Sequence, residues 1–233
     1  MDKLFRFIFV FSWLIFSGSL HAQSPFASSE KAYGLDPLLH NGKIYTYILP
    51  PGTEGDPFFN PEGFVKGSVL IRGIQYDNLF LKYDTYNQYL IFQYTTFSQG
   101  TSQIIISDAW LESFSLGDKY FEILSINDTV KRFYQVIGEG SNRILYAWRK
   151  KMELDSRHGA TNYIFSDRIR TAYLQSGSKL VKYKNNRQFI RFFESERQPL
   201  LRKYLRKQNV NVKRASDRDI IELLNFCNTQ LLQ

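Results

Sequence analysis

Apolar and polar residues alternate with a period of two over much of the chain, from Lys66 to Tyr183. The pattern is clear over residues 69–71, 79–83 and 90–94, and residues 104–106 form a short β-branched run. Successive side chains of a β-strand point to opposite faces of a sheet, so this alternation predicts strands that bury one face.

Two pairs of these segments are separated by turn residues. Residues 133–137 and 144–148 flank a turn at 139–142, and residues 169–174 and 180–183 flank a second turn at 176–178. Such turns recur at short intervals with no helical pattern between them, which favours an antiparallel meander over parallel βαβ units. We therefore expect a mainly β (α+β) fold with roughly nine to eleven strands, arranged as a partly open barrel or a sandwich.

The last fifty residues change to helical spacing. Asn185 precedes a first apolar face at 189–193, Ser195 begins a capping-box spacing for a second helix, and Ser216 precedes a third. The stripe of the third helix contains Ile220, Leu223, Leu224, Cys227 and Leu231. Short amphipathic helices need a partner, so about three C-terminal helices should pack on one another or on the sheet.

The segment before the alternating region is different in kind. Residues 44–48 follow an Asn-Gly turn signal and predict one strand. Four of the seven prolines then fall within residues 50–61, which predicts a long surface loop. Its acids, Glu54 and Asp56, are expected to be solvated rather than to hold Ca²⁺, because the spacing lacks the rest of an EF-hand loop.

The first residues have the pattern of a signal peptide. Lys3 and Arg6 precede an apolar run over 7–16, and Ala22 ends a stretch of small and polar residues, which predicts cleavage before Gln23. The alternative is an uncleaved membrane anchor, although the run is about half the roughly 20 residues that a spanning helix needs. We expect export to a bacterial periplasm or cell surface, with no transmembrane span in the mature chain.

These patterns divide the chain into four parts. We expect a signal peptide (1–22), an N-terminal strand with a Pro/Gly-rich loop (23–65), an antiparallel β domain (66–184) and a basic helical segment packed on it (185–233). The single cysteine, Cys227, allows no internal disulfide and fits a small buried residue on the last helix.

Positive charge is concentrated in one stretch of an otherwise ordinary globular composition. Residues 168–214 contain 14 Lys and Arg against two acids, whereas residues 23–167 contain 13 against 16. Such asymmetry points to an anionic partner: an acidic protein, an anionic glycan or lipid head groups. The alternative is a solvated face, and nucleic acid is not expected in an exported compartment. The candidate binding residues are Arg187, Arg191, Arg202, Lys203, Arg206 and Lys207.

Signatures of catalysis, metals and cofactors are absent from the sequence, so none is predicted. There is no P-loop or dinucleotide-binding glycine motif, and the expected mature chain has two histidines, His40 and His158, which are too few for a typical zinc site. A hydrolase acting on an envelope polymer is the alternative function. It would use His158 near Asp155 and Ser156, or paired carboxylates, for which Asp77, Asp84, Asp108 and Glu112 are candidates.

Several tyrosines fall close together around one predicted hairpin. They could form a stacking platform for sugars, but a tyrosine-rich β core with polar tips is the favoured interpretation. The residues are Tyr76, Tyr83, Tyr86, Tyr89 and Tyr94.

Four segments, at 55–59, 67–76, 81–84 and 219–224, together with the Ala22-Gln23 junction, resemble an uncharacterised family of exported proteins of Bacteroidetes-type bacteria. The resemblance implies a compartment and a style of fold, and transfers no active site. The sequence thus predicts an exported, non-enzymatic binding or envelope-associated module with a basic helical face.

Overall fold

A computed structural model describes residues 35–96, 98–125, 131–155, 162–177 and 179–230. The chain divides into two compact units, 1–36 and 37–233, and every element below belongs to the second. The strands are β1 (Lys43–Ile44), β2 (Val65–Ile71), β3 (Ile74–Asp84), β4 (Tyr89–Thr95), β5 (Thr101–Ile105), β6 (Leu111–Leu116), β7 (Lys119–Leu124), β8 (Arg132–Ile137), β9 (Asn142–Arg149), β10 (Met152–Asp155), β11 (Asn162–Phe165), β12 (Ile169–Ser176) and β13 (Lys179–Tyr183). The helices are α2 (Asn186–Ile190), α3 (Gln198–Lys207) and α4 (Asp217–Gln230).

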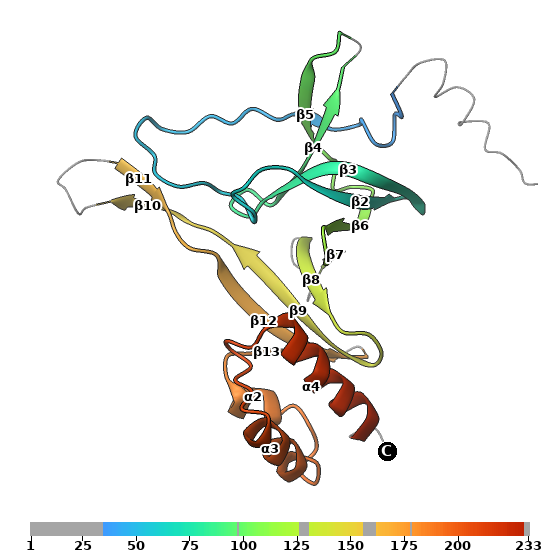
Figure 1. The fold of residues 1–233 in the computed structure, drawn as a ribbon, viewed down its shortest axis with the longest axis vertical. Helices are drawn as coiled ribbons and strands as arrows, with labels where there is room; N and C mark the ends of the chain where they lie inside the picture. Colours follow the sequence, from blue (N-terminus) through green and yellow to red (C-terminus); the bar gives the residue numbers. More distant parts are fainter. Residues whose placement is uncertain (1–34, 97, 126–130, 156–161, 178, 231–233) are drawn as a thin grey trace, which may run out of the picture. The chain divides into compact units, whose positions relative to one another are not determined.

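Eleven strands form one antiparallel sheet in the order β1-β5-β4-β3-β2-β6-β7-β8-β9-β12-β13 (Figure 1). Most neighbours in the sheet are also neighbours in sequence, so the predicted meander and the mainly β fold class are confirmed. The two predicted hairpins are β8–β9 and β12–β13. The sheet is not closed into a barrel, because β1 and β13 are its two edges.

Four strands lie in segments for which the period-two pattern made no specific prediction. β6 and β7 form a hairpin within the main sheet, and β10 and β11 form a separate two-stranded sheet between β9 and β12. Of the candidate hydrolase residues Asp155, Ser156 and His158, Asp155 is the last residue of β10, and Ser156 and His158 lie outside the described residues.

The first core is formed mainly by residues of β2 to β8 with Leu39 and Phe59, and aromatic rings pack together within it. The Tyr83 ring has its centroid 5.3 Å from that of Phe133 and 5.9 Å from that of Phe114, and Phe114 stacks on Phe121 at 4.6 Å. Edge-to-face and offset contacts of this kind are the favourable geometries for aromatic rings.

In β3 the period-two alternation buries one face as predicted, with Leu81 and Tyr83 buried and Phe80 46% exposed. β4 and β9, in contrast, also bury Ile91 and Leu145 on the other face.

A second core lies between the last strands and the three helices (Figure 1). Tyr146 of β9 and Leu174 of β12 belong to the same buried cluster as Leu205 of α3 and Leu224 of α4. Trp148 packs against both cores. The C-terminal helices thus pack on the sheet as their amphipathic patterns require.

Two of the three helix starts follow the sequence signals. The Asn185 side chain accepts a hydrogen bond from the Gln188 backbone N–H and caps α2. At α4, Ser216 and Asp219 exchange side-chain to backbone bonds, as in a capping box. The capping box predicted at Ser195 is wrong. α3 begins later, with Arg197 as its N-cap, and the Arg197 side chain makes no cap hydrogen bond. This start places Pro199 in the first turn, where its missing N–H is tolerated.

The predicted strand at 44–48 is mostly wrong, since β1 contains only Lys43–Ile44. Beyond it the chain runs without a regular ladder, and Ile48 is 81% exposed. β-branched composition alone cannot hold a segment in a strand when no neighbouring strand supplies the remaining hydrogen bonds.

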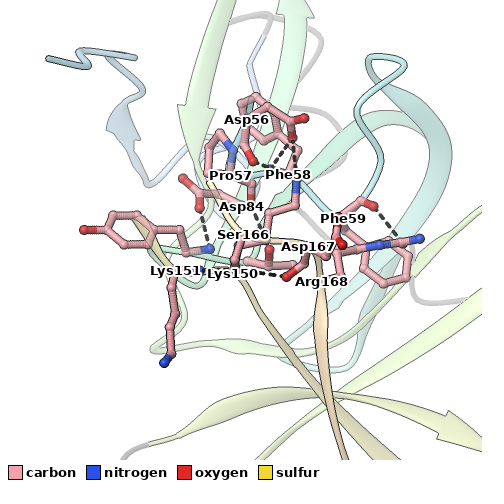
Figure 2. A network of polar contacts seen from close by, with 12 residues as sticks. Asp56, Pro57, Phe58, Phe59, Asp84, Lys150, Lys151, Ser166, Asp167 and Arg168 are labelled. Carbon is pink, nitrogen blue, oxygen red and sulfur yellow. Dashed lines mark hydrogen bonds and ion pairs between the residues drawn. The ribbon is translucent and has the colours of Figure 1, made fainter. Parts of the chain in front are cut away.

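The Pro/Gly-rich segment is an irregular loop as predicted, but it lies on the surface only in part, because its middle is anchored in the protein. Phe58 and Phe59 are 8% and 2% exposed, and Phe59 packs against Trp148. Figure 2 shows the polar contacts that hold this segment: Lys150 Nζ lies 3.2 Å from the Asp56 carboxylate, and Arg168 donates to the Phe59 carbonyl at 2.8 Å. Asp56 is therefore an ion-pair partner rather than a solvated acid.

Replacing Phe59 by Ala tests this anchoring. Loss of a fully buried ring should lower the free energy of unfolding by about 3–5 kcal/mol, measured by urea denaturation. The matched control is Phe80→Ala on β3, where the ring is 46% exposed and a loss of less than about 1 kcal/mol is expected. Equal losses for both variants would contradict a buried loop.

Candidate functional site

The cationic side chains of α2 and α3 line a hollow between these helices. We define the basic hollow by Arg187 and Arg191, which come from α2 and its C-cap, and Arg202 and Arg206 from α3. Its volume is about 740 Å³, and Ile190 and Leu205 also line it. The structure therefore brings four of the six predicted binding residues around one concave surface.

Burial of the apolar residues explains why the arginines face outward. Leu201 and Leu205 of α3 are 0% and 4% exposed, in the helical core. Arg202 and Arg206 each follow one of these residues by one position, about 100° around the helix, and both are exposed. The two arginines are one helical turn apart on the same side, as are Arg187 and Arg191 on α2.

A Schellman motif turns the chain at the end of α3 and builds another wall of the hollow. The Val210 N–H donates to the Leu205 carbonyl at 2.9 Å, and the Asn209 N–H donates to the Arg206 carbonyl at 3.2 Å. Asn209 has φ = 51°, the left-handed conformation that this motif requires and that Asn adopts more readily than most residues. Asn209 and Val210 both line the hollow.

Asn186 fixes this wall to α2. Its side-chain amide donates to the Val210 carbonyl at 2.7 Å and accepts from the Val212 N–H at 2.9 Å. Both bonds span more than twenty residues of sequence, so they join the start of α2 to the segment after α3. The hollow is thus shaped by backbone contacts and not only by flexible side chains.

The other two predicted residues lie outside the hollow. Lys203 and Lys207 line a separate depression together with Pro199, where they meet the outer sides of Arg202 and Arg206. All six predicted side chains are exposed. The six therefore form one basic face. Its four arginines also line the basic hollow, and its two lysines do not.

No acid neutralises this face within the part of the chain that the structure describes. No carboxylate oxygen there lies within 4 Å of a nitrogen of the six cations, whereas the nearby Glu194 pairs with Arg197. Arg202 donates to the Gln198 side-chain oxygen at 3.2 Å, which is a neutral partner. Like charges one turn apart on a helix repel by a few tenths of a kcal/mol per pair.

The candidate carboxylates for a hydrolase have other partners. Asp84 is fully buried and accepts hydrogen bonds from the Asn87 backbone and side chain, and burial raises its pKa above the ordinary value. The Asp77 and Glu112 carboxylates are each exposed and accept one hydrogen bond, and Asp108 is exposed at the start of a turn. Asp84 stabilises a turn in this arrangement, and the other three carboxylates are exposed.

The tyrosines of the β3–β4 hairpin divide between core and surface. Tyr83 is buried and its hydroxyl donates to the Gln88 side chain at 2.8 Å, while Tyr76 and Tyr94 pack against the first core. Tyr86 and Tyr89 are about 40% exposed. Three of the five therefore contribute to a tyrosine-rich core.

No group of three or more His, Cys, Asp or Glu side chains able to hold a metal ion occurs among the residues that the structure describes. None of the described helices is long and apolar enough to cross a membrane. Residues 1–22, the predicted signal peptide, lie outside the described residues.

Asn186 and Asn209 shape the basic hollow, and the sequence pattern did not identify them. An Asn two residues past a helix end is a recognisable C-cap signal, so Asn209 could have been found from the sequence. The contacts of Asn186 with Val210 and Val212 depend on the tertiary fold and leave no local signal.

Comparison of the chain with protein-family models, with curated proteins and with solved structures finds no match. The resemblance to exported Bacteroidetes-type proteins therefore stays a prediction.

The Asn186→Ala substitution tests the construction of the hollow. It leaves the Val210 carbonyl and the Val212 N–H without their partner, which should lower the free energy of unfolding by about 1–3 kcal/mol. The matched control is Asn225→Ala, on an exposed position of α4, where helix propensity favours Ala and no loss is expected. Urea denaturation measures both. An Asn186→Ala variant with an unchanged free energy of unfolding would show that the wall does not depend on these bonds.

The thiol of Cys227 should be chemically inert in the folded protein. It is fully buried in the helical core, and burial raises its pKa to about 12. Only the thiolate reacts with a disulfide reagent, so at pH 8 the native protein should leave 5,5′-dithiobis(2-nitrobenzoate) unreacted while the urea-unfolded chain reacts. Rapid labelling under native conditions would contradict the burial.

Proposed function

We propose that this protein is an exported, non-enzymatic module of the periplasm or cell surface that binds an anionic partner through its basic face. The face consists of Arg187, Arg191, Arg202, Lys203, Arg206 and Lys207. Support for export comes from the leader pattern of residues 1–22 in the sequence. Support for binding comes from the arrangement of the cations.

The observation that carries the proposal is an acid-free cluster of six exposed cations on two helices. A solvated basic surface is usually interspersed with acids, whereas no carboxylate among the described residues pairs with this face. The helix dipole accounts for Arg206 and Lys207, which lie in the last turn of α3. It does not account for Arg202 and Lys203, which lie nearer the middle of the helix.

The helices hold these charges together at a cost that a ligand would relieve. Three pairs of cations lie four residues apart, namely 187 with 191, 202 with 206 and 203 with 207, and each pair is repulsive. The apolar faces of the same helices are fixed in the helical core, so the backbone positions that carry the charges cannot move apart without loss of packing. An anionic partner would convert this repulsion into binding free energy.

An acidic protein segment is the partner that fits the face best. No aromatic ring lines the hollow, so a sugar ring has no stacking surface there. Among the six cations' near neighbours on α3, Leu200 is the exposed large apolar side chain, at 44%, which provides little for insertion into a membrane. Arginines, in contrast, pair well with carboxylates at protein interfaces.

The test is binding of the purified protein to poly-glutamate, with a sulfated glycan and anionic phospholipid vesicles measured in parallel. Binding to poly-glutamate should be detectable in 20 mM NaCl and weaken by about tenfold or more at 150 mM NaCl, because salt screens exposed charges. Replacing all six cations by Gln should abolish it.

The matched control replaces six other exposed cations by Gln and keeps the net charge equal to that of the first variant. These are Lys43, Lys66, Lys131, Arg132, Arg149 and Lys151. The control should bind within about threefold of the unaltered protein, because it keeps the basic face, whereas attraction that depended only on net charge would fall equally in the two variants. Equal loss in the two variants, or no binding at low salt, would reject the basic face as a binding site. If the protein binds the glycan or the vesicles more tightly than poly-glutamate, that anion and not an acidic protein segment is the partner.

A further inference from the structure

The geometry points to the basic hollow as a site for phosphate groups, in a ligand or modified protein segment that carries at least two of them. This inference rests on the proposed function, because it assigns the chemistry that the concave part of the basic face recognises. The remaining two cations, Lys203 and Lys207, would act at longer range.

The four cations of the hollow are all arginines, whereas both cations outside it are lysines. A guanidinium presents several N–H donors in a planar fork that matches the oxygens of a phosphate or carboxylate, while an ammonium is a point charge. Arg187 and Arg191 approach from α2, and Arg202 and Arg206 from α3, so two forks are available on each of two helices. An oxyanion in the hollow can therefore accept hydrogen bonds from both helices at once.

Charge density favours phosphate over carboxylate. A phosphate monoester carries between about 1.5 and 2 negative charges at neutral pH and offers three strong acceptor oxygens. Two such groups balance the four guanidinium groups, whereas four carboxylates would be needed. A volume of about 740 Å³ lies within the range of roughly 300–1,000 Å³ typical of small-ligand sites, which suits two phosphates with the atoms that join them.

The lining of the hollow indicates recognition through charge. Its apolar members are Ile190 and Leu205, which are only 7% and 4% exposed, and the half-buried Val210, and no aromatic side chain lines it. The ligand's remaining atoms therefore find little surface for stacking or apolar contact. The hollow should therefore recognise the phosphate groups of a ligand and select little for the rest of its structure.

The wall formed by Asn209 and Val210 makes the site concave before any ligand binds. The Schellman motif and the two Asn186 bonds fix this backbone, so the wall does not need to be ordered on binding. A preorganised site avoids part of the entropy cost of association. Lys203 and Lys207 stand outside this wall, where they contribute to the electrostatic attraction of an anion but not to its contacts.

The test is isothermal titration calorimetry of the purified protein with inorganic tripolyphosphate in 150 mM NaCl, with citrate as the carboxylate anion for comparison. Tripolyphosphate should bind with a stoichiometry of one and at least about tenfold more tightly than citrate. The Arg191→Lys/Arg202→Lys variant keeps the charge but loses the forks, and should bind tripolyphosphate about tenfold more weakly. The Lys203→Ala/Lys207→Ala variant, which removes two charges, should stay within about threefold at this salt concentration.

Circular dichroism verifies that each variant is folded, and the single Arg202→Lys variant replaces the double variant if the latter is not. The inference is overturned if citrate binds as tightly as tripolyphosphate, if the lysine pair matters as much as the arginine pair, or if tripolyphosphate does not bind. If tripolyphosphate fails while poly-glutamate still binds through the six cations, the proposed function stands without this site. If both fail, the basic face has no anionic partner of either kind.

Discussion

Burial of the apolar faces of three short helices against β9, β12 and β13 is the constraint on which the rest of the structure depends. Tyr146 and Leu174 on the sheet share one buried cluster with Leu205 and Leu224 on the helices. None of these helices is long enough to be stable alone in water. The packing that stabilises α2 and α3 also determines which of their side chains face solvent, and those side chains are the cations.

The same constraint turns a charged stretch of sequence into a shaped site. Residues 168–214 carry 14 Lys and Arg against two acids, but charge alone gives only a diffuse attraction. The Schellman motif after α3, with Asn209 in the left-handed conformation, and the two hydrogen bonds of Asn186 bring the chain back against α2. A hollow lined by four arginines follows from this return, and it separates the arginines from Lys203 and Lys207.

The sequence was informative wherever local pattern and tertiary packing agree. Period-two alternation predicted the antiparallel sheet, and helical spacing after Asn185 predicted α2 to α4, because burial of one face is recorded in residue order. The Pro/Gly-rich segment is only in part a surface loop because Phe58 and Phe59 are anchored by Lys150 and Arg168, which lie about a hundred residues away. The six cations were identifiable from composition, but the hollow that groups four of them depends on contacts between residues 186 and 210–212 that leave no local signal.

The most direct measurement is the set of arginine side-chain Nε–H signals in an NMR titration of the protein with inorganic tripolyphosphate. If the basic hollow is the binding site, the signals of Arg187, Arg191, Arg202 and Arg206 should shift together and saturate at one ligand per protein, while Arg143, which pairs with Glu122, stays unchanged. Shifts spread evenly over arginines on the sheet and helices, without saturation, would contradict a defined anion site.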